Sequence, residues 1–313
     1  MASSPTRQNT SAWPALLALG VAFVSAGAGG GARAQEAATS FPFSVDGVYN
    51  EIETKYIFGF TDGSDIGLQG EMAIETDTNA AFRRRTGTYM GVEQEVEFEH
   101  VPTQYFAYEL SAHGMAQRIK GDESLEDRSG VRASGLSVNL RYLLVGRGPG
   151  SPIGLTVMAE PEWSRVDGLS GAPTRSLGSS FKLIADTELI ANRLFAAANM
   201  SYAPDAAKAV GDLGWSRTAT FGASGALVWR FTPIITAGAE AEYFLAYNSL
   251  GFGAFQGRSV YVGPTLHVQV TRKIMLAAAY STQVAGHALA DGRSLDLTNF
   301  SRHRARLKLE FEF

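Results

Sequence analysis

The sequence contains no cysteine. A chain without cysteine has no disulfide, no thiolate-bound metal site and no lipid attached to an N-terminal cysteine. A chain of 313 residues that lacks disulfides must therefore gain its stability from a large core or from a closed sheet.

The chain also lacks an excess of positive charge and a long apolar run. Its formal net charge is −4, so the charge gives no indication of a nucleic-acid partner. Hydrophobic residues make up 45% of the chain, yet they form no uninterrupted stretch of the roughly 20 residues that a transmembrane helix needs. That balance suits a membrane β-barrel, in which about half of each strand is apolar and half is polar.

The first 34 residues have the pattern of a cleavable secretory signal peptide. A polar start with Arg7 precedes an apolar stretch at 13–26, and a run of small residues then ends in Ala32-Arg33-Ala34. This A-x-A sequence predicts a mature chain that begins at Gln35. The alternative is an N-terminal transmembrane anchor, which the short apolar stretch disfavours.

Residues 305–313 alternate between apolar and charged side chains. They read A-R-L-K-L-E-F-E-F and end on Phe313. Period 2 predicts a β-strand with one apolar and one charged face. The segment resembles the closing strand of a bacterial outer-membrane β-barrel, whose last residue is usually Phe. The resemblance implies the outer membrane of a Gram-negative bacterium, and the barrel assembly machinery as a partner that reads Phe313.

Working back from this segment, the sequence predicts eleven more strands, joined alternately by short and by longer polar connections. Asp, Gly, Ser and Pro are frequent in the longer connections, as turn chemistry requires. The pattern predicts an all-β, antiparallel up-and-down transmembrane barrel of about 12 strands, with 14 as the alternative. The predicted strands are 66–77, 87–100, 104–117, 133–145, 153–166, 178–190, 193–203, 216–231, 234–247, 258–271 and 274–285.

Residues 35–65 lie between the predicted signal peptide and the predicted barrel. Within them, residues 51–61 (E-I-E-T-K-Y-I-F-G-F-T) also have the pattern of a strand, which would break the even strand count. We therefore expect 35–65 to be an N-terminal segment that plugs the lumen or extends across the periplasmic mouth. The barrel itself is expected to comprise residues 66–313.

Several predicted strands carry an apolar row that is expected to face lipid. Aromatic residues near the short turns, such as Tyr142, Trp229 and Phe231, fit an aromatic girdle. A soluble β-sandwich or lipocalin-like barrel is the alternative, but twelve strands with one polar face each would need two cores. The apolar rows are Val92, Val96, Phe98; Leu136, Val138, Leu140, Tyr142; Leu155, Val157, Trp163; Phe221, Leu227, Trp229, Phe231; and Val262, Leu266, Val268, Val270.

The opposite faces carry charged side chains, which predicts a polar lumen. In a closed barrel the last strand pairs with the first, so the cations at the end of the chain should lie beside carboxylates of the first strands. Glu109 and Asp186 fall at inward positions too. The lumen-lining candidates are Glu71, Glu75, Glu93, Glu95, Glu97, Glu99, Arg141, Glu160, Glu162, Lys182, Glu188, Arg230, Glu240, Glu242, Arg304, Arg306 and Lys308.

An interior with an acidic and a basic wall favours a channel or porin-like protein for passive passage of small polar or charged solutes. One alternative is a plugged structural barrel that acts through its extracellular loops. Another is an outer-membrane hydrolase near His113, His287 and Asp291. No nucleophile is fixed beside these histidines, and the histidine spacings are not those of metal ligands, so we predict no catalytic residue, metal or cofactor.

Four phrases carry a resemblance to a family of uncharacterised alphaproteobacterial outer-membrane proteins. They are FGFTDGSD at 58–65, RGPGSP at 147–152, YVGPT at 261–265 and FSRHRAR at 300–306. The resemblance covers nearly the whole mature chain and brings no established activity. It indicates that the 58–65 phrase and the Arg302–Arg306 cluster are the first places to mutate.

Overall fold

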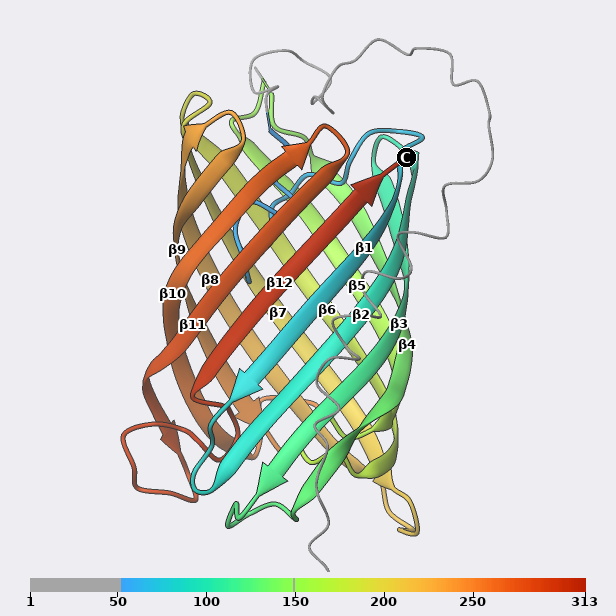
Figure 1. Cartoon of the computed structure of the whole chain (residues 1–313), viewed down its shortest axis with the longest axis vertical. Helices are drawn as coiled ribbons and strands as arrows, with labels where there is room; N and C mark the ends of the chain where they lie inside the picture. Colours follow the sequence, from blue (N-terminus) through green and yellow to red (C-terminus); the bar gives the residue numbers. More distant parts are fainter. Residues whose placement is uncertain (1–51, 149) are drawn as a thin grey trace, which may run out of the picture. The chain divides into compact units, whose positions relative to one another are not determined.

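The computed structural model describes residues 52–148 and 150–313, which form one closed antiparallel barrel (Figure 1). Twelve strands follow one another around it, so the predicted fold is confirmed. The predicted signal peptide and residues 35–51 lie outside the described residues. No helix in the described part of the chain is long and apolar enough to cross a membrane. The strands are β1 (Met72–Phe82), β2 (Thr88–Thr103), β3 (Phe106–Lys120), β4 (Arg128–Val145), β5 (Ile153–Val166), β6 (Pro173–Ile190), β7 (Leu194–Ala209), β8 (Ser216–Thr232), β9 (Ile235–Tyr247), β10 (Phe255–Thr271), β11 (Ile274–Ala288) and β12 (His303–Glu312).

The first and last strands close the barrel. Asp77 on β1 lies opposite Lys308 on β12, and Ala80 lies opposite Ala305. Each of the twelve described strands therefore hydrogen-bonds to two neighbours, and none of them is left as a sheet edge. The connections that follow β2, β4, β6, β8 and β10 lie at the end of the barrel where β12 finishes, and those that follow β1, β3, β5, β7, β9 and β11 lie at the opposite end (Figure 1). We call these the turn end and the loop end.

Several strands extend further toward the loop end than the sequence predicts. β6 begins at Pro173 and β7 continues to Ala209, so the connections there shrink to 167–172 and 210–215. These extensions contain Ser, Thr, Ala and Arg, and they lack the apolar alternation that marks a lipid-facing strand. The apolar alternation in the sequence therefore ends before the backbone hydrogen bonds between the strands end.

The start of the barrel differs from the prediction as well. β1 begins at Met72 rather than at residue 66, because Gly67 and Gly70 have positive φ angles of 85° and 91°. Residues 52–61 are not a strand, so the strand pattern that we assigned to 51–61 is wrong for its described part. Ile57 and Phe58 are instead fully buried against β7 and β8.

The outer face of the barrel is apolar over many strands. Tyr142, Val157, Leu183 and Met200 are direct neighbours across β4, β5, β6 and β7, and all four are exposed. Exposed apolar side chains in a continuous row form the band that meets lipid in a transmembrane barrel. Of the predicted rows, Val96, Leu136, Leu140, Trp163, Leu227, Phe231, Val262, Leu266 and Val270 are also exposed.

Substitution of Leu183 by Arg tests this lipid-facing band. We expect Leu183→Arg to lower the free energy of unfolding in phospholipid vesicles by about 2–4 kcal/mol, the cost of a cation near the bilayer midplane. Urea titration measures the difference. Leu213→Arg is the matched control, because Leu213 is 95% exposed in the 210–215 connection. Equal effects of the two substitutions would contradict the assignment of this face.

Candidate functional site

Residues 54–65, which we call the inner segment, cross the interior of the barrel. The backbone amides of Phe60 and Thr61 donate to the carboxylate of Glu240 on β9, and the carbonyl of Phe58 accepts from Thr265 on β10. Arg306 on β12 donates to the carbonyl of Gly59. The inner segment is therefore anchored to the barrel by side chains that point inward from the strands.

Lys55 is the one cation of the inner segment, residues 54–65, and it is buried. Its ammonium nitrogen lies 2.5 Å from Glu99, 2.7 Å from Glu109 and 3.6 Å from Glu75, and its side chain is 1% exposed. Burial alone would lower the pKa of Lys55, but the three carboxylates outweigh it and raise the pKa well above its usual value. Lys55 is therefore held charged among carboxylates of β1, β2 and β3.

Asp62 has the opposite role across the lumen. Its carboxylate lies 2.6 Å from Lys182, 3.9 Å from Arg306 and 4.0 Å from Arg141. Burial alone would raise the pKa of Asp62, but these cations hold it well below its usual range. Asp62 thus provides the negative charge for cations of β4, β6 and β12.

A third anchor lies at the turn end. Arg147, in the connection between β4 and β5, bonds to Asp65 of the inner segment and lies 3.1 Å from Asp186 on β6. Asp186 also accepts from the Thr54 hydroxyl and, at 2.8 Å, from the Ser64 amide. Both ends of the inner segment are therefore bonded to the same carboxylate.

The cations of β12 are engaged individually. Lys308 lies 2.6 Å from Glu75, Arg306 lies 2.6 Å from Asp77, and Arg304 lies 2.7 Å from Glu242. The guanidinium of Arg304 also stacks on the ring of Phe60, 4.3 Å from its centroid. As expected, a cation of the last strand lies beside Glu75 of the first strand. The cations and carboxylates do not form two separate walls, because each cation of β12 is paired with a carboxylate.

Most predicted lumen-lining side chains are on the inner face, but their settings differ. Glu71 is the exception, because it precedes β1 rather than lying on it. Some are buried in polar contacts, and these are Glu75, Glu97, Glu99, Arg141, Glu188, Arg230, Glu240, Glu242 and Lys308. Others are only partly buried, and these are Glu93, Glu95, Glu160, Glu162, Lys182, Arg304 and Arg306. Their part in solute passage stays a prediction.

The residues of the inner segment that meet these side chains were not predicted from the sequence. Lys55, Asp62 and Asp65 occupy a segment whose apolar positions imitate a strand, and Arg147 falls in a Gly-rich connection. The available signal was the FGFTDGSD phrase at 58–65, which indicated a place to mutate but gave no partners for its residues.

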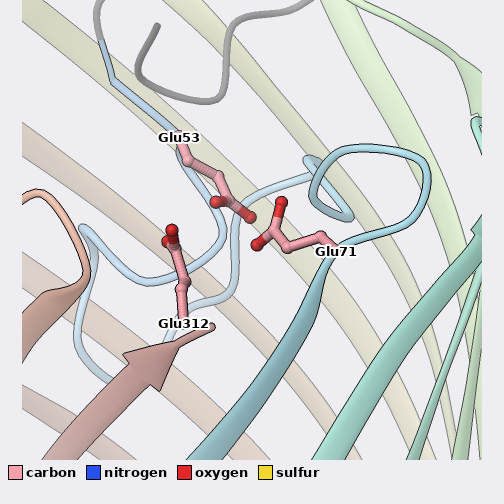
Figure 2. A group of neighbouring side chains, drawn as sticks. All are labelled: Glu53, Glu71 and Glu312. Atoms are coloured by element: carbon pink, nitrogen blue, oxygen red, sulfur yellow. The ribbon is translucent and has the colours of Figure 1, made fainter. Parts of the chain in front are cut away.

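Three carboxylates converge at the turn end (Figure 2). Glu53 precedes the inner segment, Glu71 precedes β1, and Glu312 ends β12; an oxygen of each lies within 4.8 Å of the others. Burial and the neighbouring carboxylates raise the pKa of Glu53 well above its usual value, and burial chiefly raises that of Glu71. Carboxylates at this spacing are able to hold a divalent cation.

The loop half of the interior contains a cavity of about 490 Å³, which we call the outer vestibule. Phe60 and Arg304 line its inner end, and Asp167 and Gly168, in the connection between β5 and β6, line its outer end. The other lining residues are Asn79, Ala80, Ala81, Tyr89, Gly91, Val92, Glu93, Met115, Ser134, Glu162, Ser164, Val166, Thr174, Ser176, Asp205, Ala207 and Ala305.

The residues of the hydrolase hypothesis are not brought together. His113 lies mid-strand on β3, not at the outer end as expected, and its Nε2 is 2.9 Å from the Ser137 hydroxyl inside the barrel. His287 is exposed on β11, and Asp291 lies near Arg85 and Arg293. The structure therefore gives this hypothesis no shared site.

An even-stranded closed barrel with an apolar outside and a charged inside has the fold of an outer-membrane β-barrel protein. Within that class the chain belongs to a family of unknown function, DUF6662, whose model matches residues 50–313. No curated protein matches the sequence. The predicted alphaproteobacterial origin stays a prediction.

Solved outer-membrane barrels share this fold at low sequence identity. An outer-membrane channel from Pseudomonas putida F1 is 12% identical with a TM-score of 0.51, covering 80% of this chain and 98% of that chain. The β-domain of the Bordetella autotransporter Brka is 14% identical, also with a TM-score of 0.51, covering 79% and 100%. At these low sequence identities the similarity shows a shared fold.

Removal of the Lys55 charge tests the central anchor. Lys55→Met leaves Glu99 and Glu109 buried without their cation, so we expect the free energy of unfolding to fall by about 3–5 kcal/mol. Urea titration in vesicles measures it. Lys120→Met, at the exposed end of β3, is the control and should change little. A similar small effect for both variants would show that Lys55 does not hold the inner segment.

The carboxylate group at the turn end should make docking of the inner segment depend on pH. A carboxyl whose pKa is raised in the docked state destabilises docking as the pH rises from about 4.5 toward the raised pKa. At pH 8 we expect slower amide hydrogen exchange over 54–65 in Glu53→Gln than in the unsubstituted protein. At pH 4 the two should match.

Glu126→Gln provides the control for this pH dependence, because Glu126 is exposed in the 121–127 connection. Its exchange profile should follow the unsubstituted protein at both pH values. Faster exchange at pH 8 in Glu53→Gln would mean that the ionised Glu53 stabilises docking.

Proposed function

We propose that this protein is an outer-membrane channel for the passive passage of small polar or charged solutes, and that its inner segment closes the channel. The outer vestibule carries the proposal. It reaches from the loop end into the charged interior and stops at Phe60, within the inner segment, and Arg304. A barrel filled only for structural support has no need of a polar cavity of this size.

The contacts that hold the inner segment support a closed channel that can open. Its backbone bonds to itself, as from Gly63 to Lys55, and to strand side chains, as from Phe60 to Glu240. It has no place in the order of the barrel strands. Its release would break side-chain contacts and leave the barrel ladder intact.

The proposal includes the route to the membrane. Residues 1–34 would direct export and be cleaved after Ala34, and Phe313 would be read by the assembly machinery of a Gram-negative bacterium. The support is the A-x-A pattern and the alternating strand at 305–313. Lipid would then contact the exposed apolar row on β4 to β7.

The barrel that acts through extracellular loops has less support. The connections 121–127, 167–172, 210–215 and 248–254 are short. In the longest, 289–302, Asp296 is fully buried, and its carbonyl accepts a hydrogen bond from Gln283 on β11. The loops in the described part of the chain therefore offer little surface for a partner to bind.

Single-channel conductance in a planar bilayer tests the proposal. We expect the full-length protein to stay mostly closed and a form without residues 35–65 to conduct steadily. Asp62→Asn should increase the open fraction, because Lys182, Arg141 and Arg306 would lose their shared carboxylate.

Asp212→Asn is the matched control for the bilayer experiment, because Asp212 is exposed in the 210–215 connection. It should behave as the unsubstituted protein. Silence of every form, when each runs as a folded barrel on an unheated gel, would overturn the channel function. Equal open fractions in Asp62→Asn and Asp212→Asn would overturn closure by the inner segment.

A further inference from the structure

We infer that the outer vestibule is a binding site for small organic cations that carry ammonium groups. The inference rests on the proposed channel function, since it names the class of solute that the channel would receive. Its basis is an excess of carboxylates around a cavity of suitable size. About 490 Å³ falls within the range of small-molecule sites, roughly 300–1,000 Å³.

The charges of the lining are mostly negative. Glu93, Glu162, Asp167 and Asp205 line the vestibule, and Arg304 is the one cation that does so among the described residues. Arg304 is already paired with Glu242 at 2.7 Å and stacked on Phe60. A solute in the vestibule therefore meets a net negative field, which low-dielectric walls strengthen.

Two of these carboxylates, Glu93 and Glu162, form no ion pair with a Lys or Arg of the described ranges 52–148 and 150–313. The nearest ring nitrogen to Glu93 is Nδ1 of His113, at 3.6 Å. Glu162 and Glu160 add to the negative charge around Glu93. A bound cation would relieve this repulsion.

A buried hydroxyl gives a second, independent observation. Ser134 is 2% exposed and lines the vestibule, and its hydroxyl oxygen has no hydrogen-bond partner in the described part of the chain. A buried hydroxyl without a partner costs free energy, roughly 1–3 kcal/mol. An ammonium N–H could donate to this oxygen, while the neighbouring hydroxyls of Ser164, Thr174 and Ser176 are already bonded within the barrel.

The inner end of the vestibule favours an organic cation that stops there. Arg304 repels a cation from the inner end of the vestibule, and Tyr89 and Met115 add apolar surface beside the carboxylates. An aliphatic chain can lie against those side chains while its ammonium groups face Glu93 and Glu162. Among the described lining residues, a small dianion would find one cation, Arg304, which is already paired.

Isothermal titration of the full-length protein in nanodiscs tests the inference, with 1,4-diaminobutane as the probe at low ionic strength. We expect saturable binding that Glu93→Gln/Glu162→Gln weakens by about tenfold or more. Glu126→Gln, in the exposed 121–127 connection, should bind as the unsubstituted protein does. Glutarate, a dianion of similar length, should give no binding.

Several results would overturn the inference. Binding that survives Glu93→Gln/Glu162→Gln would place the diamine elsewhere, and equal binding of glutarate would mean that charge does not select the solute. Saturable binding of Mg²⁺ that excludes the diamine would make this a metal site. Titration uses the closed protein. Diamine binding by a protein that shows no conductance in planar bilayers would therefore overturn the channel function but not the solute class. Conductance without diamine binding would overturn the solute class alone.

Discussion

The interior of this barrel depends on one constraint, which is that inward charges need partners of opposite sign. A closed antiparallel barrel directs every second side chain inward, and here many of those side chains are carboxylates, lysines and arginines. Lys55 and Asp62 of the inner segment meet them in opposite senses. Lys55 neutralises a group of carboxylates, and Asp62 neutralises a group of cations. The inner segment therefore acts as the counter-charge of the turn half of the lumen.

The same constraint explains why the two halves of the lumen differ. In the turn half, the inner segment fills the space and its charges are balanced by those of the strands. In the loop half, Glu93 and Glu162 remain beside an open vestibule without a Lys or Arg partner in the described chain. Balanced charges favour closure, and unbalanced ones favour a solute that brings the missing charge.

Much of the fold was predictable because period-2 alternation survives wherever a strand touches lipid on one side. The predicted strand at 153–166 matches β5, and the final alternating segment matches β12. The inner segment was not predictable in the same way. Tyr56, Phe58 and Phe60 recur at every second position as in a strand, yet residues 52–61 form no strand. Phe58 packs inside the barrel, and the partners of Lys55 lie on three different strands. Such partnerships arise from closure, which brings distant residues together, and no local pattern records them.

The most direct test of the account is a cross-link between the inner segment and the barrel wall. The Thr61 and Ser224 hydroxyls lie 3.1 Å apart, and the chain has no native cysteine to compete. The account predicts that Thr61→Cys/Ser224→Cys forms an intramolecular disulfide on mild oxidation of the folded protein, detected by mass spectrometry of the linked peptides. Thr61→Cys/Ser216→Cys, with the second cysteine at the far end of β8, should remain reduced. Equal cross-linking of both pairs, or none in either, would contradict an inner segment held in the lumen.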